Sequence, residues 1–132
     1  MSNGTIASNP QIEHVAVFAL EREKLQAWYR KMFGFSAVYM DGKETTFIKA
    51  SNGMLLEFMD AESGEKPACE NICGFRHIAF SVESFDGIEA RLEKENIGII
   101  RKSVSPDKET EMLFFYDPEG NMIQIVYRKK PL

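Results

Sequence analysis

Apolar and polar positions alternate, or recur with helical spacing, along two separate stretches of the chain. In the first stretch, residues 12–60, the pattern predicts a strand, an amphipathic helix and three further strands. The predicted strands cover 12–19, 35–40, 45–50 and 54–59, and the helix places Leu25, Trp28, Tyr29, Met32 and Phe33 on one core-facing side. Gly34 suits the position just after the helix. Asp41-Gly42 is a strong signal for a tight hairpin turn.

The second stretch, residues 75–128, repeats this order. Strands are predicted at 75–82, 99–104, 110–116 and 122–127, with a short helix marked by Phe85, Ile88 and Leu92. Ser84 is the expected N-cap of that helix, and Gly98 lies near its end. The turn residues Asp117-Pro-Glu-Gly-Asn121 join the last two strands.

Chemically distinctive residues of the two stretches recur in register. His14 and His77 lie 63 residues apart, and the pairs Phe47/Phe114, Gly53/Gly120 and Glu57/Gln124 lie 67 apart. This internal repeat predicts an α+β fold of two tandem strand-helix-strand-strand-strand units. We expect a flexible N-terminus at 1–11 and a single domain at 12–132, with units at 12–60 and 75–128 and a linker at 61–74.

Composition narrows the classes of partner. The 132 residues are 44% hydrophobic and 27% charged, which suits one soluble domain. The net charge of −4, without a basic stripe, argues against nucleic acid. No apolar run is long enough for a membrane span, and the polar N-terminus lacks a signal-peptide core, so we expect a cytoplasmic protein. Cys69 and Cys73 are interpreted as free thiols, the alternative being a metal or redox pair.

Four polar side chains interrupt otherwise apolar strand faces. Alternation places His14, Glu57, His77 and Gln124 each among apolar neighbours. An ionised Glu57 on such a face is costly unless it is paired or bound to metal. If the two sheets close on each other, two imidazoles, a carboxylate and an amide oxygen can converge on a divalent metal. The alternative is that each histidine is a hydrogen-bonded core residue.

Several charged residues are placed outside this set. Glu13 and Arg76 neighbour the histidines but are predicted by alternation to face the other way. The remaining arginines considered are interpreted as surface charges, one of which could bind an anionic substrate group: Arg22, Arg30, Arg91 and Arg101.

The sequence resembles the vicinal oxygen chelate superfamily, which includes glyoxalase I, methylmalonyl-CoA epimerase, fosfomycin-resistance thiol transferases, extradiol dioxygenases and bleomycin-resistance proteins. The segments that carry the resemblance cover nearly the whole chain after residue 11: Ile12-Glu-His-Val-Ala-Val, Trp28-Tyr-Arg-Lys-Met-Phe-Gly-Phe35, Phe75-Arg-His-Ile-Ala-Phe and Phe115-Tyr-Asp-Pro-Glu-Gly-Asn-Met-Ile-Gln-Ile125. The resemblance implies a glyoxalase-like fold, with curved mixed sheets around a cleft. It also implies a homodimer, whose metal site is built from one chain or from two.

The resemblance places metal ligands at His14, Glu57, His77 and Gln124, with the metal being zinc, nickel, cobalt or manganese. Gln124 departs from the glutamate of the glyoxalase pattern and cannot take up a proton, so Glu57 is left as metal ligand and proton-transfer base. The neutral ligand leaves the site more positive, which favours an anionic or enediolate-like intermediate.

Two functions follow from the resemblance. The first is a divalent-metal-dependent lyase or isomerase of the glyoxalase or epimerase type, acting on a small substrate with vicinal oxygens. The arginine and asparagine typical of glutathione-dependent glyoxalases are missing after His14 and Glu57. The second is a non-catalytic small-molecule binding protein of the bleomycin-resistance type. A redox protein based on Cys69 and Cys73 is a third possibility.

Overall fold

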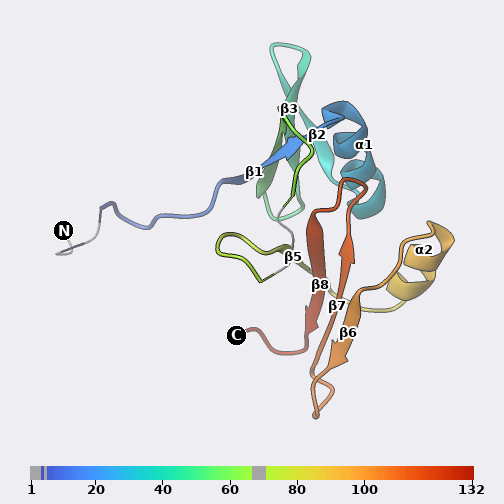
Figure 1. Cartoon of the computed structure of the whole chain (residues 1–132). Helices are drawn as coiled ribbons and strands as arrows, with labels where there is room; N and C mark the ends of the chain where they lie inside the picture. Colours follow the sequence, from blue (N-terminus) through green and yellow to red (C-terminus); the bar gives the residue numbers. More distant parts are fainter. Residues whose placement is uncertain (1–3, 5, 67–70) are drawn as a thin grey trace. The chain divides into compact units, whose positions relative to one another are not determined.

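The computed structural model describes residue 4 and residues 6–66 and 71–132, and Figure 1 shows the elements in order. The chain divides into two compact units, Met1–Glu65 (unit 1) and Lys66–Leu132 (unit 2). Unit 1 contains β1 (His14–Ala19), α1 (Arg22–Phe33), β2 (Ser36–Met40), β3 (Lys43–Lys49) and β4 (Leu55–Asp60). Unit 2 contains β5 (Ile78–Ser81), α2 (Ile88–Lys94), β6 (Arg101–Val104), β7 (Thr110–Tyr116) and β8 (Met122–Arg128). The predicted α+β fold of two βαβββ units is confirmed.

The four strands of unit 1 form one mixed sheet in the order β1-β4-β3-β2, in which β1 is parallel to β4 and the other pairs are antiparallel. One face of the sheet is apolar and packs against α1. Tyr29 of α1 is fully buried, and its ring centroid lies 5.4 Å from that of Phe58 on β4. Leu25 and Leu56 are also buried, which confirms the predicted core-facing side of the helix.

The predicted helix end and the predicted hairpin turn of unit 1 are also confirmed. Gly34 adopts a left-handed conformation (φ 69°) after α1, and its N–H donates to the carbonyl of Arg30. Asp41 (φ 52°) and Gly42 (φ 76°) both have positive φ between β2 and β3. A two-residue hairpin turn of type I′ requires that conformation at both central positions.

Unit 2 repeats the topology, with the sheet order β5-β8-β7-β6 and a parallel β5-β8 pair. Its core consists of apolar side chains that are no more than 3% exposed: Leu92, Leu113, Phe115, Ile123 and Ile125. Among the described residues, no helix is long and apolar enough to cross a membrane. Cys73 is an exposed free thiol, whereas Cys69 lies outside the described residues.

Three strands were predicted to begin two or three residues too early. β1 begins at His14 rather than residue 12, and β6 begins at Arg101 rather than residue 99. The strand predicted at 75–82 is reduced to β5, Ile78–Ser81, so His77 lies just before it. An apolar pattern indicates which side chains suit a strand. The strand itself extends only as far as its backbone pairs with a neighbouring strand.

The N-cap predicted for α2 was wrong, and the helix ends at Lys94, four residues before Gly98. Gly87 (φ 78°) is the N-cap, while the Ser84 hydroxyl instead accepts the N–H of Asp86 in the preceding turn. At the other end, Asn96 (φ 57°) takes the left-handed conformation, and the N–H of Ile97 donates to the carbonyl of Leu92. Asparagine tolerates this backbone region, so Gly98 is not needed there.

A buried aspartate holds the turn between β7 and β8. Asp117 is 4% exposed, and its Oδ1 accepts the N–H groups of Glu119 and Asn121 at 2.9 Å each. Its Oδ2 accepts the Asn121 side-chain amide at 2.8 Å. The turn therefore sets where β8, the strand of Gln124, begins.

We expect Asp117→Ala to lower the free energy of unfolding by about 2–4 kcal/mol, because the N–H groups lose a charged acceptor. The measurement is urea denaturation followed by circular dichroism. Asp107→Ala is the matched control, since Asp107 accepts the N–H of Glu109 in the same way but is exposed. Equal losses for the two variants would contradict a special role for the buried turn.

Candidate functional site

Strand register places the polar side chains of His14 and Glu57 on the face of the unit 1 sheet opposite to α1. Glu57 of β4 lies opposite Ala16 of β1 on one side and Phe47 of β3 on the other. His14 shares the face of Ala16, two residues earlier. Since neighbouring β4 side chains Leu56 and Phe58 are buried, Glu57 points away from the apolar core.

This register brings His14 and Glu57 together. His14 Nε2 lies 3.8 Å from Glu57 Oε1, and the side chains are 39% and 23% exposed. His14 Nδ1 lies 2.9 Å from Glu13 Oε1. A carboxylate only accepts hydrogen bonds, so Nδ1 carries a proton in this contact and Nε2 is the ring nitrogen that faces Glu57. The imidazole also packs edge-on against Phe47, with the centroids 5.6 Å apart.

The sheet of unit 2 carries the equivalent row. Gln124 of β8 lies opposite Ala79 of β5 and Phe114 of β7, and Phe114 lies opposite Arg101 of β6. The His77 ring packs edge-on against Phe114, with the centroids 5.3 Å apart. The match with the His14–Phe47 contact confirms the repeat at the level of side chains.

Gln124 is 8% exposed, and its Nε2 donates to the Met112 sulfur at 3.3 Å. This bond orients the amide and leaves Oε1 without a hydrogen-bond partner among the described residues. The available atom is therefore the oxygen, which is the one that a divalent metal prefers.

Glu13 and Arg76 do not turn away from the histidines, so the prediction for both was wrong. Arg76 Nη1 donates to His77 Nδ1 at 3.3 Å, just as Glu13 accepts from His14. Both residues lie before the first regular residue of their strand, where alternation of faces does not apply. The sequence signal that could have found them is their equivalent place in the repeat.

The donor pair of unit 1 fits a divalent metal. Two atoms that each lie ~2.1 Å from one ion are at most ~4.2 Å apart, and His14 Nε2 and Glu57 Oε1 meet that limit at 3.8 Å. Glu13 supplies the carboxylate behind the histidine that typically orients a metal ligand.

The donor pair of unit 2, His77 and Gln124, fits a divalent metal on one condition. An arginine only donates, so His77 Nδ1 accepts and Nε2 carries the proton. His77 can offer Nε2 only when Arg76 releases Nδ1. No group of three or more His, Cys, Asp or Glu side chains suited to a metal occurs in the described part of the chain. The predicted set therefore needs both pairs, which the structure describes separately.

The arginines predicted to be surface charges behave differently from one another. Three form ion pairs with acidic side chains: Arg22 with Asp60, Arg30 with Glu44 and Arg91 with Glu95. Arg101 instead lies over the ring of Phe114, with Cζ 4.9 Å from the centroid. It therefore belongs to the polar face of unit 2.

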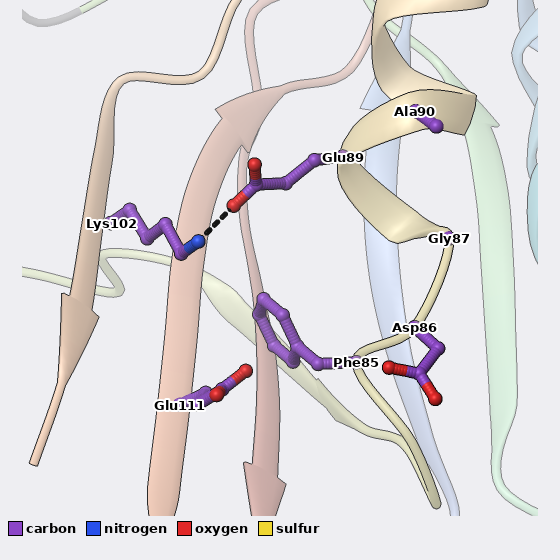
Figure 2. A pocket seen from close by; sticks show the side chains of 7 residues that line it. All are labelled: Phe85, Asp86, Gly87, Glu89, Ala90, Lys102 and Glu111. Atoms are coloured by element: carbon purple, nitrogen blue, oxygen red, sulfur yellow. Dashed lines mark ion pairs between the residues drawn. The ribbon is translucent and has the colours of Figure 1, made fainter. Parts of the chain in front are cut away.

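A hollow of about 270 Å³ lies on the other face of the unit 2 sheet, beside α2. Figure 2 shows Lys102 reaching toward Glu89, and this hydrogen bond raises the pKa of the lysine. Lys102 lies opposite Leu113 of the buried face, so the hollow is separate from Gln124. Its lining is Phe85, Asp86, Gly87, Glu89, Ala90, Lys102 and Glu111.

Comparisons with known proteins identify the family to which the sequence is similar. The sequence model of the Glyoxalase/Bleomycin resistance protein/Dioxygenase superfamily matches residues 11–125. The uncharacterized protein YaeR of Escherichia coli K12 is 31% identical over 121 residues, which are 87% of this chain and 94% of YaeR.

Solved structures share the fold. A glyoxalase/dioxygenase from Nostoc punctiforme superposes with a TM-score of 0.77 at 19% identity, covering 98% of this chain and all of that one (100%). A lactoylglutathione lyase from Agrobacterium tumefaciens gives 0.65 at 20% identity, covering 92% and 96%.

We expect opposite tautomers for the two histidines when their imidazoles are uncharged. His14 should carry its proton on Nδ1 and His77 on Nε2, because their partners are an acceptor and a donor. Nitrogen-15 NMR of metal-free protein measures this directly. Glu13→Gln should weaken the preference at His14 alone, and Arg76→Gln the preference at His77 alone. The same tautomer at both positions would contradict the contacts described above.

Proposed function

This chain belongs to the Glyoxalase/Bleomycin resistance protein/Dioxygenase superfamily, and we propose that it is a divalent-metal-dependent lyase or isomerase acting on a small substrate with vicinal oxygens. The observation that carries the proposal is the His14–Glu57 pair, whose donor atoms face each other at 3.8 Å. A histidine whose other nitrogen is held by a carboxylate is arranged as metal ligands usually are.

The ligand set of the proposal is His14, Glu57, His77 and Gln124. A divalent ion held there would act as a Lewis acid on the vicinal oxygens of the substrate. Gln124 would bind through Oε1, the atom that its bond to Met112 leaves available. Zinc, nickel, cobalt and manganese all suit such nitrogen and oxygen donors.

Glu57 is the proposed proton-transfer base. It is the only carboxylate of the set, because the equivalent position in unit 2 is Gln124. An amide cannot take up a proton near neutral pH, so one group must both remove the substrate proton and return it. This favours a reaction in which the proton moves between neighbouring carbon atoms, or back to the same carbon.

A second sheet is needed to complete the site. Phe18 and Met59 share the face of His14 and Glu57, and they are 67% and 41% exposed. Covering them would bury apolar surface and exclude water from the base. We expect the protein to be a homodimer, with the metal ligands contributed by one chain or by two.

Metal analysis tests the ligand set. We expect near-stoichiometric divalent metal in purified wild-type protein and its loss in His77→Ala. Arg91→Ala, which removes a paired charge on α2 of the same unit, is the control and should keep the metal. No metal in the wild type after reconstitution with zinc, nickel, cobalt or manganese would favour the non-catalytic binding protein of the bleomycin-resistance type.

Replacement of the base tests the chemistry. In a screen of hemithioacetals and acyl-thioesters, Glu57→Gln should lower kcat by ~10²-fold or more, because it removes the proton acceptor. Rates are compared per bound metal, so that weaker metal binding does not imitate a lost base. Glu44→Gln, which removes a carboxylate from β3 of the same unit, should leave kcat unchanged. Unchanged turnover in metal-loaded Glu57→Gln would eliminate Glu57 as the base.

A further inference from the structure

Two arginines of unit 2 lie against one aromatic ring, on the face of the sheet that carries Gln124. The Cζ atoms of Arg76 and Arg101 are 5.2 Å and 4.9 Å from the centroid of Phe114. Arg101 lies opposite Phe114 across β6 and β7, and Phe114 lies opposite Gln124 across β7 and β8. Both guanidinium groups therefore belong to the row that contains Gln124, beside His77.

These two cations have no acidic partner within the described part of the chain. Neither Arg76 nor Arg101 forms an ion pair with any residue that the structure describes, whereas Arg22, Arg30 and Arg91 each do. The face of an aromatic ring offsets only part of the repulsion between two like charges. The arrangement therefore has an uncompensated charge that an anion would neutralise.

The equivalent positions of unit 1 do not carry two arginines. The residues 63 positions earlier, at the spacing of the two histidines, are Glu13 and Val38. The two cations are thus particular to unit 2 and do not come from the repeated fold. A requirement for packing or for strand pairing would apply to both units, so a ligand explains the difference better.

We propose that Arg76 and Arg101 bind the carboxylate of a small 2-hydroxy or 2-oxo acid beside His77. The planar guanidinium fork matches a carboxylate in two hydrogen bonds, and charged pairs of this kind are the stronger ones. The inference rests on the proposed function in that it names the substrate class of the same site. Binding of the carboxylate to the two arginines does not itself require a metal.

The test is an NMR titration of the full-length, chelator-treated protein with glycolate. Glycolate should shift the signals of Phe114 and Arg101 saturably, whereas propane-1,2-diol, which has vicinal oxygens but no charge, should not. The dissociation constant should rise by about 10-fold or more in Arg76→Gln/Arg101→Gln, since the charged hydrogen bonds are lost. Arg91→Gln on α2 is the matched control and should bind glycolate like the wild type.

Three results would overturn the inference: no saturable glycolate binding, unchanged affinity in the double variant, or a response to inorganic phosphate but not to glycolate. If the double variant does not fold, the single variants decide, and each should weaken binding. Glycolate binding in a protein that takes up no metal would overturn the proposed function alone. Metal binding without glycolate binding would overturn this inference alone.

Discussion

Parallel pairing between the first and last strand of each unit is the constraint on which the candidate site depends. It places Ala16 beside Glu57 in unit 1 and Ala79 beside Gln124 in unit 2. Side chains alternate with a period of two, so a slip by one residue would turn the polar row into the apolar core. The buried side chains on the opposite face oppose that slip: Leu56, Phe58, Ile123 and Ile125. The buried face of each sheet thus specifies which side chains lie on the polar face.

This constraint explains how much the sequence could predict. The strands, the hairpin at Asp41-Gly42 and the shared face of the polar residues follow from alternation, turn chemistry and the repeat, all of which are local or periodic. The ends of β5 and α2 did not follow, because strand pairing and the left-handed Asn96 depend on the folded neighbours. The contacts of Glu13 and Arg76 were missed for a related reason. Both residues precede the regular strand, where the direction of a long side chain is set by its partner and not by periodicity.

The two units keep one backbone plan but have opposite electrostatic character. At equivalent positions, Glu13 is replaced by Arg76 and Glu57 by Gln124, and each exchange makes the polar face of unit 2 more positive. Val38 is replaced by Arg101, with the same effect. Phe47 lies opposite Glu57 and Phe114 lies opposite Gln124, so the pairing of the last two strands keeps the same register in both units. The polar face of unit 1 thus carries the carboxylates Glu13 and Glu57, whereas that of unit 2 carries the cations Arg76 and Arg101.

Arg76 links the two proposed ligands, the divalent metal and the carboxylate of the substrate. While its guanidinium donates to His77 Nδ1, the proton of His77 stays on Nε2 and that nitrogen cannot bind a metal. An anion between Arg76 and Arg101 offers the guanidinium a charged acceptor, which is a stronger partner than a neutral imidazole. Binding of the anion therefore favours the tautomer of His77 that a metal requires, and binding of the metal in turn frees Arg76 for the anion. Such coupling is reciprocal by thermodynamic necessity. An acid substrate would by this route help to complete its own site, whereas a neutral molecule of the same shape would not.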